Sequence, residues 1–277
     1  AIDYPSSSRR GKGRSARKGE SHYKTMIPFI SWHTIALGPV TLQVWGLFVA
    51  SGFLVGAFVA QWYAKRNGEN PDVIAGLAVW MIAAGMIGGR LGHVLFYEFA
   101  YYAAHPLEVF AVWHGGLSMF GGLIACVLVG VWYLRRHHVD VWKYCDITVF
   151  GLPFGIAIGR IGCFLIHDHP GTATHFALGV QYPDGVTRHD LGLYEVINGA
   201  AMAVVFLLLS RRKLPVGVYV GVFSLWYGVF RVATDGLRTV DVRYLGLTPG
   251  QYLGVLLALF GAGVLVWITR RQKRREV

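Results

Sequence analysis

The chain contains apolar runs that are each close to the length of a membrane-spanning helix. A helix needs about 20 mostly apolar residues to cross the hydrocarbon core of a bilayer. Only 15% of the 277 residues are charged, against about 25% in an ordinary soluble domain. The chain is therefore predicted to be an all-α integral membrane protein with about seven transmembrane helices, near residues 41–63, 73–97, 117–134, 144–166, 191–210, 214–235 and 250–269.

The basic residues are divided unevenly between the two sides of these runs. Because cytoplasmic loops carry an excess of Lys and Arg, the division places the C-terminus in the cytoplasm and the N-terminus outside. It also explains the net charge of +11 without a nucleic-acid partner. The outer loops hold Arg188, Arg238 and Arg243, and the inner ones hold Lys65, Arg66, Arg135, Arg136, Lys143, Arg211, Arg212, Lys213, Arg270, Arg271, Lys273, Arg274 and Arg275.

Residues 1–25 differ in composition from the rest of the chain. They are rich in Ser, Gly, Lys and Arg and poor in apolar residues, which predicts a disordered basic tail, an extension upstream of Met26. The tail lacks the apolar core of a signal peptide. Residues 26–277 are expected to form a single transmembrane domain, with the loop near 167–190 as a small extracytoplasmic cap.

Three arginines lie inside apolar runs. Arg90, Arg160 and Arg231 stand near the outer ends of the second, fourth and sixth runs, which all travel outward. A rise of about 1.5 Å per residue puts them at one depth. Since a charge in the membrane is costly, such a cluster is treated as a functional site. Guanidinium groups match phosphate oxygens, which predicts a phospholipid headgroup in the outer leaflet. We expect its cavity between the second, fourth, fifth and sixth runs, open sideways to lipid.

Carboxylates at the same level offer the alternative that the arginines only form ion pairs. Glu195 stands about one turn into the fifth run. Tyr227, Arg231 and Asp235 recur every four residues and share one helix face. We expect Asp235 to orient Arg231 towards a ligand, with Arg238 just beyond.

Glycines surround these arginines in "GMIGGRLGH" and "GIAIGRIG". Small residues four apart let membrane helices approach closely. The segment "HGGLSMFGGLIA", residues 114–125, contains Gly121 and Gly122 and is predicted to be a broken or re-entrant start of the third run. Irregular backbone at that depth has to line protein or a wet cavity. Ordinary helix packing is the alternative.

The sequence "HDHPG" places His167, Asp168 and His169 directly after the Arg160 run. A metal would require the loop to close on a third ligand. We expect a polar, pH-sensitive cap with no metal and no cofactor. The cysteines are interpreted as buried apolar fillers, because all three lie inside apolar runs without a metal-binding or disulfide pattern: Cys126, Cys145 and Cys163.

The ordered set of motifs resembles the prolipoprotein diacylglyceryl transferase family from about Met26 to Arg270. The resemblance rests on "GGRLGHVLFY", "HPLEVFAVWHGGLSMFGGLIA", "GRIGCFLIHDHPG", "RHDLGLYE", "YGVFRVATDGLR" and "LTPGQYL". It implies transfer of a diacylglyceryl group from phosphatidylglycerol to the lipobox cysteine of prolipoproteins, with release of glycerol phosphate. It also implies a multi-pass protein of the bacterial cytoplasmic (inner) membrane, whose partners are phosphatidylglycerol and prolipoprotein signal peptides. By this resemblance the family's phosphate contacts map onto Arg160 and Arg231. The last glycine of the signature matches Gly171, the glutamate of the LYE motif matches Glu195, and the sixth-helix motif matches Tyr227 and Arg238.

The chain departs from the family pattern at several positions. The family histidine is replaced by Phe120 and the first asparagine by Cys163. The remaining departures are Trp45, Ile166 and Asp168, in place of a tyrosine, an asparagine and a glutamate.

Because Phe120 cannot accept a proton, we expect His167, His169 or Asp168 to act as the base. The alternatives are a divergent, non-catalytic phospholipid-binding membrane protein, or a transferase that acts on another headgroup or acceptor. A transporter is disfavoured because the chain shows no inverted repeat.

Overall fold

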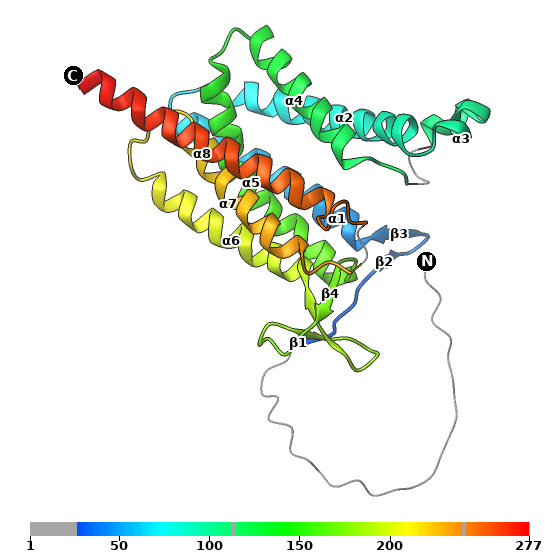
Figure 1. Ribbon diagram of the computed structural model, residues 1–277. Helices are drawn as coiled ribbons and strands as arrows, with labels where there is room; N and C mark the ends of the chain where they lie inside the picture. The colour runs from blue at the N-terminus through cyan, green and yellow to red at the C-terminus, as the bar shows by residue number, and fades with distance from the viewer. Residues whose placement is uncertain (1–26, 112–114, 240–241, 277) are drawn as a thin grey trace, which may run out of the picture.

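The computed structural model describes residues 27–111, 115–239 and 242–276 and is mostly helical (Figure 1). The predicted tail at residues 1–25 lies outside them. Short helices α3 (Phe99–Ala104) and η1 (Pro106–Phe110) follow the second long helix. The long helices are α1 (Val44–Arg66), α2 (Pro71–Phe96), α4 (Met119–Arg136), α5 (Val141–Ile166), α6 (Leu191–Leu209), α7 (Val218–Asp235) and α8 (Pro249–Glu276).

Six helices of the described part are long and apolar enough to cross a membrane, which confirms an all-α membrane protein. The helix outside this set is α7, which carries Arg231 and Asp235. It nevertheless packs antiparallel along α8, since Gly221 faces Gly261 and Gly228 faces Gly254. If α8 crosses the bilayer, α7 crosses it beside α8. The prediction of seven transmembrane helices therefore stands as a prediction.

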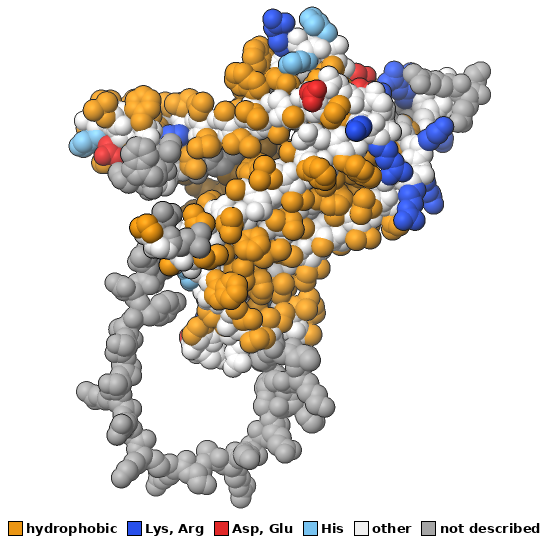
Figure 2. Space-filling view, turned by 180° about the vertical axis from the view of Figure 1, so that it is seen from behind, with side chains coloured by type: hydrophobic (Ala, Val, Ile, Leu, Met, Phe, Trp, Pro, Cys, Tyr) orange, Lys and Arg blue, Asp and Glu red, His pale blue; other side chains and the backbone are white. Residues whose placement is uncertain are grey.

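The starts of the helices follow from short polar residues that cap them. The side chains of Asn70, Ser118, Asp140 and Asp190 accept hydrogen bonds from the first free backbone N–H groups of α2, α4, α5 and α6. Such caps satisfy donors that have no partner inside the helix. Basic side chains gather at one end of the molecule, as the inward loops predict (Figure 2).

The long helices form two groups that are held together internally by glycines. In one group α1 packs on α5, and a Cβ atom at Gly52 would lie 2.5 Å from the Gly155 carbonyl oxygen. In the other group α2 packs on α4, and a Cβ atom at Gly92 would lie 2.8 Å from Gly121 Cα. Small residues permit these close approaches. Figure 1 shows α2 and α4 diverging from the other long helices.

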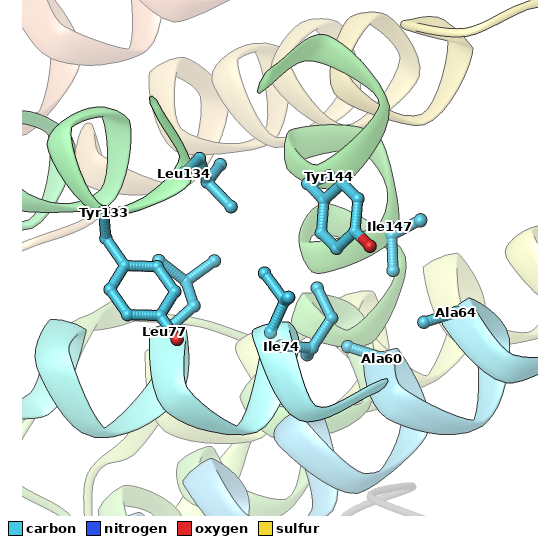
Figure 3. Close-up of a cluster of buried hydrophobic side chains, with 9 residues drawn as sticks. Ala60, Ala64, Ile74, Leu77, Tyr133, Leu134, Tyr144 and Ile147 are labelled. Carbon is cyan, nitrogen blue, oxygen red and sulfur yellow. The ribbon is translucent and has the colours of Figure 1, made fainter. Parts of the chain in front are cut away.

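The two groups meet in a hydrophobic junction near the basic end (Figure 3). Ala60 and Ala64 of α1, Ile74 of α2, Leu134 of α4 and Ile147 of α5 are buried there. At its edge the hydroxyl of Tyr144 accepts a hydrogen bond from the Asn70 backbone N–H. The junction closes one end of the space between the groups and leaves the other end open.

A small cap lies at the end of the helices opposite the basic residues and includes strands from the loop near 167–190. Its four-stranded sheet has the order β1-β5-β6-β4, in which only β1 and β5 are parallel. The segment before the first long helix supplies strand β1, for which the sequence gives no signal. The sheet strands are β1 (Ile27–Pro28), β4 (Pro170–Ala173), β5 (Val180–Gln181) and β6 (Thr187–Asp190), and a separate hairpin joins β2 (Thr34–Leu37) to β3 (Val40–Gln43).

Candidate active site

A cavity of about 740 Å³ lies between the two helix groups. Apolar side chains and glycines of α1, α2 and α5 line it from the hydrophobic junction outward. Its polar end contains Arg160, Cys163, Asp168 and His169, with Trp45 beside them. The cavity was predicted between the second, fourth, fifth and sixth runs. That placement was wrong, because α1 lines the cavity and neither α6 nor α7 contributes a lining residue among those described.

Arg160 is the charged group that α5 presents to this cavity. Its side chain is 27% exposed, and its Nη2 atom lies 3.9 Å from Glu195 Oε1. Its Nη1 atom lies 3.9 Å from the sulfur of Cys163. The guanidinium is therefore anchored on one side and open to the cavity on the other, which suits it to bind an anion that enters from there.

Glu195 connects Arg160 to a second arginine. Its Oε1 atom lies 3.0 Å from Arg231 Nη1 and accepts a hydrogen bond from the Tyr227 hydroxyl at 3.4 Å. The other carboxylate oxygen, Oε2, is buried without a hydrogen-bond partner among the described residues. The structure thus brings three predicted site residues, Arg160, Tyr227 and Arg231, together around the carboxylate of a fourth, and of the three only Arg160 lines the cavity.

Asp235 extends this network along α7, as its spacing from Arg231 predicts. The Asp235 carboxylate lies 2.9 Å from Arg231 Nη2 and 3.0 Å from Arg238 Nε. It also accepts a hydrogen bond of 3.2 Å from the Thr248 hydroxyl, which the sequence analysis missed. Asp235 is 1% exposed, so its task is to hold the two arginines in place. Gly171 forms a β-bridge with Arg238, and this bridge joins the cap to α7.

Arg90 does not join the other two arginines. Its guanidinium donates all five N–H groups to backbone carbonyl oxygens of the returning segment, those of Glu108, Val109, Ala111, Gly115 and Gly116. Its ring contact is with Tyr102, at 5.0 Å from the centroid. The predicted convergence of three arginines was therefore wrong. Arg90 belongs to the other helix group, and its guanidinium has no N–H group left to bind a phosphate.

Gly121 and Gly122 also belong to helix packing. A Cβ atom at Gly121 would overlap the Gly88 carbonyl, and one at Gly122 would lie 3.0 Å from the Gly85 carbonyl oxygen. The predicted irregular start of α4 is present, because Gly115 and Gly116 have positive φ angles and the helix begins at Met119. Leu117 and Met119 of this segment line the cavity.

The two histidines of "HDHPG" have different surroundings. His167 ends α5 in a left-handed conformation, with φ of 50°. Its Nδ1 lies 2.6 Å from Asp190 Oδ2 and its Nε2 lies 3.1 Å from the Ile30 carbonyl oxygen. Both ring nitrogens are thus occupied within the cap. His167 is buried there and does not line the cavity, so it is unsuited to the predicted role of base.

His169 lines the cavity beside Asp168, and its Nε2 lies 3.6 Å from Asp168 Oδ2. Burial lowers the pKa of the His169 imidazole below its ordinary value, and the Asp168 carboxylate opposes this shift. Cys163 completes the group, although the sequence analysis interpreted it as a filler. The position of Cys163 in the family signature was the signal that could have identified it as a site residue.

Comparison with known proteins bears on the chemistry of this site. The family model described as prolipoprotein diacylglyceryl transferase matches residues 33–267. Proteins named phosphatidylglycerol–prolipoprotein diacylglyceryl transferase are 34% identical in Nitrosospira multiformis (88% of this chain and 89% of the relative), and 35% identical in Geobacter sulfurreducens (85% and 94%). The protein of that name from Chromohalobacter salexigens is 37% identical, over 88% of this chain and 94% of its own.

Proposed function

Because the chain belongs to the prolipoprotein diacylglyceryl transferase family, we propose that it transfers a diacylglyceryl group from phosphatidylglycerol to the cysteine thiol of a prolipoprotein. The observation that carries the proposal is the half-buried guanidinium of Arg160 at the polar end of an apolar cavity. A lipid with two acyl chains and one phosphate has the same division between apolar and charged parts.

The donor binds with its acyl chains between α1, α2 and α5. The acyl chains of a bilayer lipid are already out of water, so moving them into the cavity gains little hydrophobic free energy, and the headgroup contacts select the donor. The phosphate faces Arg160, whose planar fork matches two of its oxygens. Glu195, held in turn by Arg231 and Tyr227, keeps Arg160 in position.

The transfer forms a thioether. The thiol sulfur bonds to the glycerol carbon that carries the phosphate, and the carbon–oxygen bond to the phosphate breaks. The electron pair of that bond leaves with the oxygen as glycerol phosphate, and the thiol proton is released. Charge builds up on the leaving phosphate, where Arg160 stabilises it. Asp168 and His169, which face the same cavity, promote loss of the thiol proton.

The acceptor comes from the aqueous side, beneath the cap, and the donor comes from the bilayer. The basic end of this multi-pass membrane protein faces the cytoplasm under the positive-inside rule, so the cap and Arg160 face outward. We therefore place the donor in the outer leaflet of the bacterial cytoplasmic membrane, and the acceptor as the lipobox cysteine that follows a prolipoprotein signal peptide.

The proposal is tested with purified protein, phosphatidylglycerol vesicles and a lipobox peptide, by mass spectrometry of the peptide. A diacylglyceryl adduct on cysteine is expected with the wild type. Arg160→Lys keeps the charge but loses the fork, and the rate should fall about 10²–10³-fold. Arg136→Lys, at the opposite end of the helices, is the matched control. Lipid binding without an adduct would favour the non-catalytic alternative. Transfer from another phospholipid, and not from phosphatidylglycerol, would show that the donor has a different headgroup.

A further inference from the structure

Three side chains at the polar end of the cavity combine the donor types that bind zinc. Cys163, Asp168 and His169 offer a sulfur, a carboxylate oxygen and an imidazole nitrogen within 4.8 Å of one another. We propose that this cluster binds one zinc ion, and that the ion holds and activates the acceptor thiol. The second half of this proposal rests on the transferase function proposed above.

The spacing of the three ligand atoms is compatible with a zinc site. Zinc lies about 2.3 Å from sulfur and about 2.0–2.2 Å from nitrogen or oxygen, so neighbouring ligand atoms are roughly 3.5 Å apart. His169 Nε2 and Asp168 Oδ2 already lie 3.6 Å apart. Their side chains are 28% and 30% exposed, which leaves them room to turn towards the sulfur.

The fold supplies the third ligand that the sequence "HDHPG" lacks. His167 is held by Asp190 and Ile30 in the cap, so an H-x-H pair is excluded. The left-handed end of α5 turns the chain back, and His169 then faces Cys163 across the last turn of that helix. Arg160 Nη1, 3.9 Å from the sulfur, stands where an outer hydrogen-bond donor to a metal-bound sulfur is expected.

Three protein ligands leave a fourth position open, as in catalytic zinc sites. The cluster lines the cavity, so that position is accessible to a ligand inside it. A thiol that coordinates zinc loses its proton. The acceptor cysteine would therefore bind as thiolate and release its proton to water. Its sulfur would then stand on the side of the cavity where Arg160 holds the phosphate.

The metal site is tested on the full chain in detergent, stripped with a chelator and reloaded with Co²⁺ or Zn²⁺. We expect one equivalent of metal and, with Co²⁺, a sulfur-to-cobalt charge-transfer band. Cys163→Ser should abolish the band, while Cys126→Ser and Cys145→Ser should retain it. Loss of a residue that only hydrogen-bonds to a metal ligand lowers metal affinity about 10–100-fold. His169→Gln removes a ligand itself and should lower the affinity for metal at least as much, and His175→Gln is its control. Absence of bound metal, or a band indifferent to both Cys163→Ser and His169→Gln, would overturn the site.

The same preparations separate this inference from the proposed function. Chelation should abolish formation of the diacylglyceryl adduct, and Zn²⁺ should restore it. Full transfer by metal-free protein would overturn activation by zinc and leave the transferase function standing. Metal bound at Cys163 without any adduct from phosphatidylglycerol would overturn the transferase function and leave the metal site standing.

Discussion

Arg90 and Arg160 occupy the same local sequence, Gly-Arg-Leu-Gly and Gly-Arg-Ile-Gly, but their guanidinium groups have different partners. In both motifs the second glycine, Gly92 or Gly162, admits the backbone of a neighbouring helix. Around Arg90 the chain returns as a loop of free carbonyl groups, which use all five donors. Around Arg160 there is a carboxylate on one side and a cavity on the other.

The difference shows that the acceptors around a buried arginine decide its task. A guanidinium that is fully bonded to its own chain stabilises a fold, because every donor and acceptor is satisfied without a ligand. One that is only partly bonded retains affinity for an anion. Figure 1 shows that the helices carrying them, α2 and α5, belong to the two diverging groups.

The largest effect on stability is expected from replacing Arg90. Arg90→Lys replaces five donors by three, so at least two carbonyl groups lose their partner. Each costs about 1–3 kcal/mol, which lowers the free energy of unfolding by roughly 2–6 kcal/mol. Thermal unfolding in detergent measures this. An Arg90→Lys variant with unchanged stability but no lipid binding would return Arg90 to the ligand site.

The next effect concerns the anchor of Arg160. Glu195→Gln keeps the shape of the side chain but weakens its charged hydrogen bond to Arg231 and removes its ion pair with Arg160. Loss of about 1.5–3 kcal/mol from the transition state corresponds to about 10–100-fold in kcat. Initial rates over a range of phosphatidylglycerol concentrations provide the test. A raised KM at unchanged kcat would mean that Glu195 serves binding alone.

The two histidines repeat the comparison on a smaller scale. His167→Gln should lower stability by about 1–3 kcal/mol, because buried Asp190 loses a partner, while the folded fraction keeps its rate. His169→Gln should lower the melting temperature less than His167→Gln does and should slow the transfer. Activity per folded molecule, measured beside thermal unfolding, separates the two. Equal rates in both variants would exclude His169 from thiol activation.

The effects at the glycines of α4 are expected to be no larger than those at the histidines. Gly121→Ala forces a Cβ atom against the Gly88 carbonyl and should cost about 1–3 kcal/mol of stability. Gly122→Ala meets the Gly85 carbonyl oxygen at 3.0 Å and should cost less. Neither should change KM for phosphatidylglycerol. A raised KM in both variants would restore these glycines to the lipid site.

The membrane helices and their orientation could be predicted from the sequence, because hydrophobicity and charge determine where a residue lies along the bilayer normal. The length of the apolar runs predicted membrane helices, and their basic ends predict an orientation. The spacing of Tyr227, Arg231 and Asp235 predicted a shared face, and the ion pair between the two charged residues lies on it. Each of these patterns depends only on helix periodicity and on depth in the bilayer.

Position around and between the helices was decided only by tertiary structure. Depth alone could not distinguish Arg90 from Arg160, because both lie near the outer end of an outward helix. Glycine contacts, such as that of Gly52 with Gly155, determine which helices pack together and hence which side chains line the cavity. The approach of Cys163 to His169 needed one further detail, the left-handed turn at His167, since a backbone angle at a helix end redirects every side chain that follows it.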